Sequence, residues 1–276
     1  MSDLSLDRYV SQGVTLLGDR RRPGGVTFSF TERTGGVSLP PLASLNLGLY
    51  SGDDPAAVAE NRRRALVAMG VPEEHVGRLV SPHQVHGTHV CVVRSAELEA
   101  LEAVREEALA GCDAVVCTAA GVPVLLVYAD CLPVVLCAPG AFAVAHSGWR
   151  GTIGRISALA LDALCAETGC APEQVQAYIG PHITGEDYEV SPELLQQFVD
   201  EFGESVARPG TRLDLAEAVR IALVERGVPE EQVLDSGLST MQDTSRFYSY
   251  RAEAGTCGRI GAMAYMAPAE LEGGDA

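Results

Sequence analysis

The sequence contains no lysine, because all twenty basic residues among its 276 are arginine. This absence excludes Schiff-base chemistry on a lysine, the phosphate-binding lysine of a P-loop and the lysine–glutamate pair of protein kinases. The chain also lacks H-E-x-x-H, the H-x-E and P-C-x-x-C pair of zinc deaminases, G-x-S-x-G and G-x-G-x-x-G. A hydrolytic or deaminating site must therefore be built from another set of residues.

Positive charge is scarce as well: 37 acidic residues against 20 basic ones give a formal net charge of −17. Nucleic-acid binding depends on clustered positive charge, so we expect no nucleic-acid partner, although arginines could still hold a small anion locally. A membrane span needs roughly 20 uninterrupted apolar residues. The longest apolar region, near residues 114–136, is interrupted by Gly121, Pro123, Asp130 and Pro133.

The N-terminus has no basic segment followed by an apolar core, so we expect no signal peptide and no membrane contact. The chain contains eight cysteines. In a cytoplasmic protein these thiols stay reduced, and most behave as small buried apolar residues. We therefore expect a cytoplasmic protein without structural disulfides.

Apolar strand patterns alternate with helical patterns, and 47% hydrophobic residues suffice for a sizeable core. We expect strands at residues 26–30, 122–129, 141–145, 175–179 and 260–266. Helices are expected to begin near Asp54, Glu97, Thr152, Ser191 and Asp214. No low-complexity linker divides the chain, which indicates one mixed α/β domain over residues 26–268, preceded by segment 1–25 and followed by a flexible tail, 269–276.

Two of the expected strands end on reactive side chains. The run 122–129 leads into Asp130 and Cys131, and the run 141–145 leads into His146 and then residues 147–151, Ser-Gly-Trp-Arg-Gly. In open α/β sheets, ligands bind beyond the carboxyl ends of strands, and helix N-termini attract anions. We therefore expect an active site where these residues meet at one rim of a sheet.

The candidate metal ligands are His86, Cys131 and His146. A thiolate with two imidazoles suits zinc or copper, and three protein ligands leave the open fourth position that a catalytic zinc needs. Taken singly, each residue is as often structural: a buried thiol at a strand end, or an ordinary histidine. Two of them end expected strands and His86 lies in a turn rich in proline and glycine, so together they indicate a site.

His83 and His89 compete with His86 for the third ligand position. A further strand is expected at residues 88–93, where His89 alternates with Cys91, and this favours a structural role for His89. His83 instead could lie next to the ligands or steer the loop that carries them. The choice among the three histidines stays open at the level of residue pattern.

Arg150 lies between two glycines just before an expected helix, where backbone N–H groups and a guanidinium together fit phosphate. The neighbouring Trp149 is typical of a packing residue. Further polar residues in loops or helix starts are weaker candidates for substrate contact, since each alone is typical of a surface. They are Arg33, Asn46, Arg62 and Arg251.

Short motifs spread over most of the chain carry a family resemblance. They are R-x-G-G-V-S at 33–38, L-N-L-G at 45–48, G-D-D-P at 52–55 with N-R at 61–62, H-Q-V-H-G at 83–87, A-D-C-L-P at 129–133, H-S-G-W-R-G at 146–151, I-G-P at 179–181, and F-Y-S-Y-R at 247–251 with G-R at 258–259. In these motifs the sequence resembles the YfiH-like, laccase-domain family, formerly called multicopper polyphenol oxidases. The resemblance implies a four-layer α/β/β/α sandwich with mixed sheets. It also implies that His86, Cys131 and His146 bind the metal.

The resemblance further implies a zinc-dependent purine nucleoside phosphorylase that acts on adenosine, inosine and methylthioadenosine, with adenosine deaminase side activity. Its partners would be a purine nucleoside and phosphate, with Arg150, Arg62, Asn46, Arg251, Arg33 and His83 as substrate-binding candidates, and we expect a monomer. The chain departs from the family pattern at residues 239–242, Ala252 and Cys257. These positions bear on substrate preference more than on metal binding.

Two alternatives belong to other classes of enzyme. One is a metal-independent hydrolase with a Cys131–His146 dyad, as in relatives described as peptidoglycan editing factors. The other is a copper-dependent polyphenol oxidase, or laccase, which ranks last because three ligands do not form the several copper centres that laccase chemistry uses. A partner-binding scaffold would explain neither the candidate ligands nor the loop around Arg150.

Overall fold

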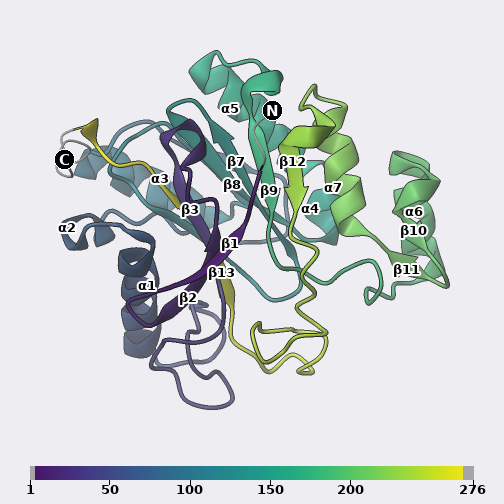
Figure 1. Ribbon diagram of the computed structural model, residues 1–276, viewed down its shortest axis with the longest axis horizontal. Coiled ribbons are helices and arrows are strands. Elements are labelled where there is room, and N and C mark those ends of the chain that lie inside the picture. The colour runs from purple at the N-terminus through teal and green to yellow at the C-terminus, as the bar shows by residue number, and fades with distance from the viewer. Residues whose placement is uncertain (1–3, 270–276) are drawn as a thin grey trace.

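Two β-sheets packed face to face form the centre of the computed structural model, which describes residues 4–269 (Figure 1). The first sheet has five strands in the order β1-β2-β3-β13-β6, and every neighbouring pair is antiparallel. Its strands are β1 (Asp7–Ser11), β2 (Val14–Gly18), β3 (Thr27–Thr31), β6 (Val124–Tyr128) and β13 (Ile260–Tyr265).

The second sheet has six strands in the order β12-β9-β7-β8-β5-β4. It is mixed, because β12 pairs with β9 and β4 with β5 in parallel while the central pairs are antiparallel. The strands are β4 (Val90–Val93), β5 (Ala114–Cys117), β7 (Leu132–Ala138), β8 (Ala141–Ser147), β9 (Gln176–Ile179) and β12 (Val233–Asp235). A separate short hairpin joins β10 (Ala207–Arg208) and β11 (Arg212–Leu213).

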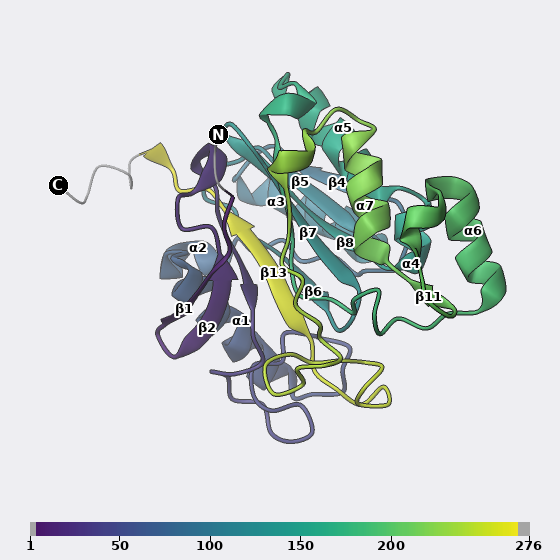
Figure 2. The ribbon, with the colours of Figure 1, turned by 45° about the vertical axis from the view of Figure 1, so that its right-hand side comes forward.

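Helices cover the outer faces of both sheets (Figure 2). The five-stranded sheet carries α1 (Pro55–Met69) and α2 (Glu73–Val76), and the six-stranded sheet carries α5 (Ile156–Thr168) and α7 (Leu215–Val224). Helix α6 (Pro192–Phe202) packs on the outer side of α7. The remaining helices are α3 (Leu98–Ala110), α4 (Trp149–Ile153), and the 3-10 turns η1 (Pro23–Gly25), η2 (Pro172–Gln174), η3 (Glu204–Val206) and η4 (Glu230–Gln232). The expected α/β/β/α sandwich is thereby confirmed, and its six-stranded sheet is the mixed one.

The buried apolar residues follow these layers. The space between the sheets is filled by large side chains such as Phe28, Phe142 and Tyr178, and Phe28 packs on Tyr178 with ring centroids 4.5 Å apart. Each such burial contributes about 1.5–3 kcal/mol. Strands β7 and β8 are buried along their whole length because they have a sheet on one face and helices on the other, which explains their unbroken apolar sequence.

The helix starts follow local capping chemistry. The side chain of Asp54 accepts a hydrogen bond from the Ala56 N–H, and Asp214 accepts one from the Glu217 N–H. At the other end of α1, Gly70 adopts a left-handed conformation with φ 109°, which glycine tolerates better than any other residue. These helix starts, which the sequence analysis expects, are confirmed. Within residues 4–269, no helix combines the length and the apolar character that crossing a membrane requires.

Three local expectations are corrected. Two strands, β1 and β2, precede the strand expected as the first, and their hairpin turns through Gln12 and Gly13 at φ 48° and 81°. Strand β1 is mostly exposed, so it lacks the apolar signal of a buried strand. The single helix expected to begin near Thr152 is two helices, because Arg155 at φ 59° separates α4 from α5. Within the expected tail, residues 270–276 lie outside the described residues.

Candidate active site

A cleft of about 630 Å³ opens where the loops at one end of the two sheets meet. Figure 2 shows the loop after β3 and the loop before β13 lying together at this end, and Arg33 joins them by donating to the Thr244 carbonyl at 2.6 Å. The β6–β7 turn and the start of α4 also line the cleft. All three candidate metal ligands lie in its wall.

The structure brings His86, Cys131 and His146 together. Their ligand atoms all lie within 4.8 Å of one another, with 3.8 Å between Cys131 Sγ and His86 Nε2. The two imidazole rings meet edge to face at a centroid distance of 4.7 Å. A thiolate and two imidazoles are donors that zinc and copper both accept, so this set could hold a metal ion.

The strands that deliver these residues differ from the expected pair. Strand β6 lies in the five-stranded sheet and β8 in the other, so they are not neighbours at one rim. After β6, the chain crosses to the second sheet and enters β7, where Pro133 pairs with His146 of β8. Cys131 therefore reaches His146 because it directly precedes β7, a strand that the sequence analysis does not separate from its apolar surroundings.

Asp113 orients the candidate ligands, and the sequence analysis misses it. It is fully buried, and its Oδ1 lies 2.8 Å from His146 Nδ1. The same carboxylate accepts backbone N–H groups of Val85, His86 and Gly87 at 3.1, 2.9 and 2.7 Å. One carboxylate thus orients the His146 ring so that Nε2 stays free for a ligand, and folds the turn that carries His86. The available signal was an acidic residue directly before a wholly apolar run, 114–117.

The charges of this group reinforce one another. Burial alone would raise the pKa of the Cys131 thiol, but His146 and His86 outweigh it and lower the pKa to about 6. Burial would likewise lower the pKa of His146, but Cys131 and Asp113 raise it to about 9. The sulfur is therefore favoured as a thiolate near neutral pH, the form that binds metals and acts as a nucleophile.

Backbone geometry makes room for these ligands. A Cβ at Gly148 would lie 2.6 Å from His86 Cδ2 and 3.2 Å from Cys131 Sγ, so a side chain there would displace the ligands. Asp130, next to Cys131, has φ 83°, an unfavourable conformation for a residue other than glycine. It is held by hydrogen bonds from Thr240 Oγ1 and the Arg251 N–H, each at 2.7 Å. The position of Cys131 is thus fixed from both sides.

Arginines without a carboxylate partner line the rest of the cleft. They are Arg62, Arg150, Arg251 and Arg259. Within residues 4–269, none of them forms an ion pair, whereas most of the other arginines do. Arg62 donates through Nε to the Leu47 carbonyl at 2.8 Å, and burial lowers its pKa to about 10. Arg150 stacks over Trp149 at 4.3 Å.

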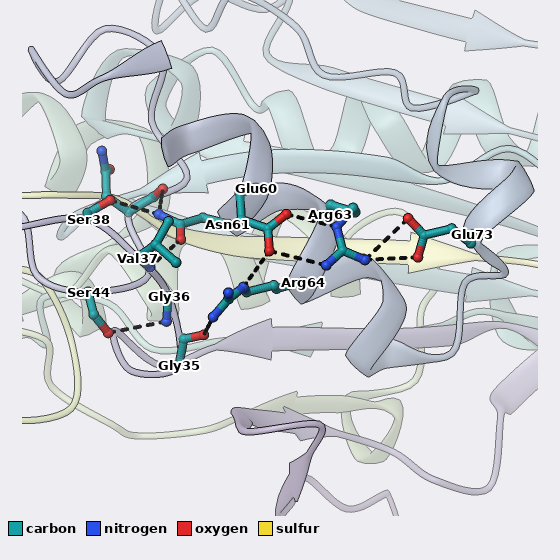
Figure 3. Close-up of polar contacts among 11 residues, drawn as sticks. Gly35, Gly36, Val37, Ser38, Ser44, Glu60, Asn61, Arg63, Arg64 and Glu73 are labelled. Carbon is teal, nitrogen blue, oxygen red and sulfur yellow. Dashed lines mark hydrogen bonds and ion pairs between the residues drawn. The ribbon is translucent and has the colours of Figure 1, made fainter. Parts of the chain in front are cut away.

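Figure 3 shows the polar contacts made by the residues of α1 on either side of Arg62 in the sequence. The neighbouring Asn61 is buried; its Oδ1 accepts the Val37 N–H at 2.8 Å, and its Nδ2 donates to Ser38 Oγ at 2.7 Å. These bonds fasten the loop after β3 to the helix. The next two arginines, Arg63 and Arg64, instead pair with Glu60 at 2.8 and 2.7 Å.

The remaining predicted residues divide into two groups. His83 lines the cleft and packs on Tyr50 with ring centroids 5.0 Å apart. Arg33 and Asn46 lie behind the cleft wall. Arg33 stacks on Tyr248 at 4.2 Å and pairs with Glu253 at 3.2 Å, and Asn46 Oδ1 accepts the Arg259 N–H at 2.9 Å. Aromatic residues that the sequence analysis does not single out also line the cleft, namely Tyr50, Tyr188 and Tyr250.

Fold and site together define an α/β/β/α sandwich with an arginine-lined cleft and a candidate metal centre made of one cysteine and two histidines. The sequence profile described as multi-copper polyphenol oxidoreductase laccase matches residues 27–267. The chain belongs to this family, as the resemblance in its motifs predicts.

Several bacterial proteins are similar over nearly the whole chain. The purine nucleoside phosphorylase of Deinococcus radiodurans is 40% identical over 256 residues, covering 91% of this chain and 93% of the relative. The purine nucleoside phosphorylase YlmD of Geobacillus stearothermophilus is 33% identical over 245 residues, covering 86% and 88%. The crystal structure of YlmD superposes with a TM-score of 0.80 at 30% identity, covering 93% of this chain and 97% of YlmD. The Bacillus licheniformis hypothetical protein YfiH superposes with a TM-score of 0.81 at 26% identity, with the same coverages.

Proposed function

We propose that this chain is a zinc-dependent purine nucleoside phosphorylase acting on adenosine, inosine and methylthioadenosine, with adenosine deaminase side activity. The names of its relatives support the first activity. The observation that carries the proposal is one cleft that holds both the set of one cysteine and two histidines and arginines without a carboxylate partner among the described residues.

Phosphate fits the arginine side of the cleft. In a chain with net charge −17, acidic partners for arginine are abundant, yet Arg62, Arg150 and Arg251 have none within the described residues. Arg62 is partly buried, and a partly buried guanidinium without a counter-ion is unfavourable, whereas Arg150 and Arg251 are exposed. A bound oxyanion would supply charge-assisted hydrogen bonds to all three. These three residues are assigned to phosphate, while Asn46 and Arg33 hold the loops behind them.

The nucleoside fits the aromatic side of the cleft. Tyr50, His83 and Tyr250 line it and offer ring faces against which a purine can stack. The volume of about 630 Å³ lies within the range of about 300–1,000 Å³ that small-molecule sites occupy. Base and phosphate are then held in one cavity, which makes attack on the sugar between them effectively unimolecular.

In phosphorolysis, a phosphate oxygen forms a bond to the anomeric carbon of the ribose. The bond from that carbon to the purine nitrogen breaks, its electron pair leaves with the base, and the base takes up a proton. Arg62 and Arg150 hold the phosphate against the sugar, and Asp113 keeps His146 oriented. In deamination, water attacks adenine C6, and ammonia and inosine result. A zinc ion held by His86, Cys131 and His146 would supply Lewis-acid chemistry.

Product analysis tests the proposal directly. The purified protein, incubated with adenosine and phosphate, is expected to give adenine and ribose 1-phosphate, and without phosphate a slower formation of inosine. Metal analysis is expected to find zinc, and Cys131→Ser to remove zinc and both activities. Absence of both ribose 1-phosphate and inosine from zinc-loaded wild-type protein would overturn the proposal.

One observation favours a second candidate function, a metal-independent cysteine hydrolase. The lowered pKa of Cys131 beside His146 is also what a thiolate nucleophile requires. Removing bound metal with a chelator distinguishes the two functions. A hydrolase acting on peptidoglycan precursors would stay active without metal, and alkylation of Cys131 would then abolish its activity. The phosphorylase would lose activity on stripping and regain it with zinc.

A further inference from the structure

A second group of metal-ligating side chains lies outside the cleft. His89 directly precedes β4, Cys91 lies within β4, and Glu107 lies on α3. One ligand atom from each residue lies within 4.8 Å of the other two, and His89 Nε2 is 2.8 Å from Glu107 Oε1. None of the three belongs to the residues that line the cleft.

The fold places these donors together for local reasons. Side chains two residues apart in extended chain point the same way, so His89 and Cys91 share one side of β4. Helix α3 packs its buried residue Ala108 into the core between the sheets, which sets the adjoining Glu107 beside β4. Cys91 is fully buried, whereas His89 and Glu107 are half-exposed. The side chains of His89 and Glu107 can therefore change rotamer, whereas the Cys91 sulfur is fixed by packing.

We propose that His89, Cys91 and Glu107 form a second metal site, which takes a thiophilic divalent cation of the zinc class. Sulfur, imidazole nitrogen and carboxylate oxygen are the three donor types that zinc uses in proteins. Bonds of 2.0–2.3 Å in a tetrahedral site separate ligand atoms by about 3.5 Å. His89 Nε2 and Glu107 Oε1 lie 2.8 Å apart and no pair of the three ligand atoms exceeds 4.8 Å, so rotation of the two half-exposed side chains suffices to close the site. This proposal does not depend on the proposed function.

The charges around the group favour a cation. Helix α3 also carries exposed Glu99, Glu102 and Glu106. The guanidinium of Arg94 interacts electrostatically with Glu107, but it donates hydrogen bonds to both carboxylate oxygens of Glu167, at 2.7 and 2.6 Å. Arg105 donates to the backbone carbonyls of Leu79 and Gly77 at 3.1 and 2.7 Å. Neither arginine forms an ion pair with Glu107, which leaves its negative charge for His89 and a bound cation.

The thiol of Cys112 packs beside the Cys91 thiol of the proposed site. The thiol of Cys112 contacts that of Cys91, and it donates to the Ala114 carbonyl at 2.8 Å. Cys112 is therefore assigned to orient Cys91 rather than to ligate. The backbone links the new site to the cleft, because the His83 N–H donates to the Ala108 carbonyl and the Cys112 N–H to the His83 carbonyl, both at 3.0 Å. A cation that ties α3 to β4 would steady the cleft wall carrying His83.

Cobalt(II) titration of the full-length protein tests the proposal, because thiolate ligation gives cobalt an intense sulfur-to-metal charge-transfer band. The background is His86→Ala with Cys131→Ser, which removes the set in the cleft. One cobalt ion per chain is expected to bind with this band, and zinc is expected to displace it. Wild-type protein is expected to bind two.

Substitutions then assign the ligands. Cys91→Ala is expected to abolish the band, while His89→Ala and Glu107→Gln each weaken cobalt binding by at least about tenfold. Both of these residues are half-exposed, so their variants are expected to fold even if the Cys91 variant does not. Glu106→Gln and Cys165→Ser are the matched controls and are expected to change nothing. The proposal is overturned by a background protein without the band, or by binding that His89→Ala and Glu107→Gln leave intact.

Discussion

Arg62 and Arg63 are neighbours on α1, yet their side chains lie in opposite electrostatic environments. Arg63 lies on the outer side of the helix, where Glu60 and Glu73 pair with it at 2.8 and 2.9 Å. Arg62 faces the cleft with one hydrogen bond to a carbonyl and no carboxylate partner among the described residues. Pairing is thus the rule on the outer surface, and the cleft departs from it where a ligand can supply the missing charge.

The cysteines show the same division. Burial raises the pKa of Cys117 to about 12, and it also raises that of Cys137. Cys131 alone among these three has imidazoles beside it, and its pKa falls to about 6. Cys117 and Cys137 act as small apolar residues of the core, whereas the surroundings of Cys131 in the cleft favour the thiolate that ligation or nucleophilic attack requires.

Removing the Arg62 charge is the strongest way to test this contrast. Arg62→Gln is expected to raise the KM for phosphate by about 100-fold, because hydrogen bonds to charged groups contribute about 1.5–3 kcal/mol each. The melting temperature is expected to stay equal or rise, since an uncompensated charge leaves a partly buried position. Phosphorolysis kinetics and thermal unfolding measure both effects.

Arg63→Gln is the matched control on the same helix. It breaks exposed ion pairs, which contribute little, so KM is expected to change by less than about twofold. If both variants shifted KM alike, or if Arg62→Gln lowered the melting temperature without changing KM, Arg62 would be a structural residue and the contrast would fail.

Asp113→Asn sharpens the comparison at the metal ligands. An amide cannot accept the His146 N–H and three backbone N–H groups as well as a carboxylate does, so the orientation of His146 and the 85–87 turn loosens. We expect zinc affinity to fall by about 10- to 100-fold, as for other residues that orient a ligand. Competition with a chromophoric chelator measures this. An unchanged zinc affinity in a folded Asp113→Asn protein would contradict the assigned role.

Gly148→Ala probes the space beside the ligands. Its Cβ would lie 2.6 Å from His86 Cδ2, so the imidazole must move, and we expect about a tenfold loss of zinc affinity. Gly77→Ala is the control, because no atom lies within 4 Å of the corresponding Cβ and its φ is −64°. Chelator competition on both proteins should separate them; equal affinities would show that the ligand loop is more tolerant than its packing indicates.

Local signals explain what the sequence could predict. Helix starts at Asp54 and Asp214 depend on side chains within three residues, so the pattern suffices. The choice of Cys131 and His146 followed from the reactive residues at the ends of two apolar runs. Donor chemistry is a property of residue types, so the pattern could name candidate ligands, and the comparison with family motifs selected His86 among three histidines.

Non-local contacts explain what the sequence could not show. Asp113 acts on residues 85–87 and on His146, and its place before the apolar run 114–117 does not reveal either partner. The position of Cys131 depends on the crossing from one sheet to the other before β7, which apolar periodicity does not reveal. Arg62 and Arg63 have the same local sequence context, and only the tertiary fold decides which of them meets a carboxylate.

The smallest expected effect is on stability and concerns Glu32, a carboxylate that is paired with two arginines. Its side chain is 2% exposed between Arg8 and Arg246 at 2.7 and 2.8 Å. Burial would raise its pKa, but the two arginines outweigh this and lower it. The lowered pKa stabilises the fold above the unfolded value near 4.5, and that stability is lost as pH falls through the folded pKa. Glu32→Gln is therefore expected to cost about 1–2 kcal/mol at pH 7 and progressively less below about pH 4. Urea unfolding of the wild type and the variant at pH 7 and below about pH 4 measures the difference in the free energy of unfolding. A loss of stability independent of pH would show that packing, not charge, holds Glu32.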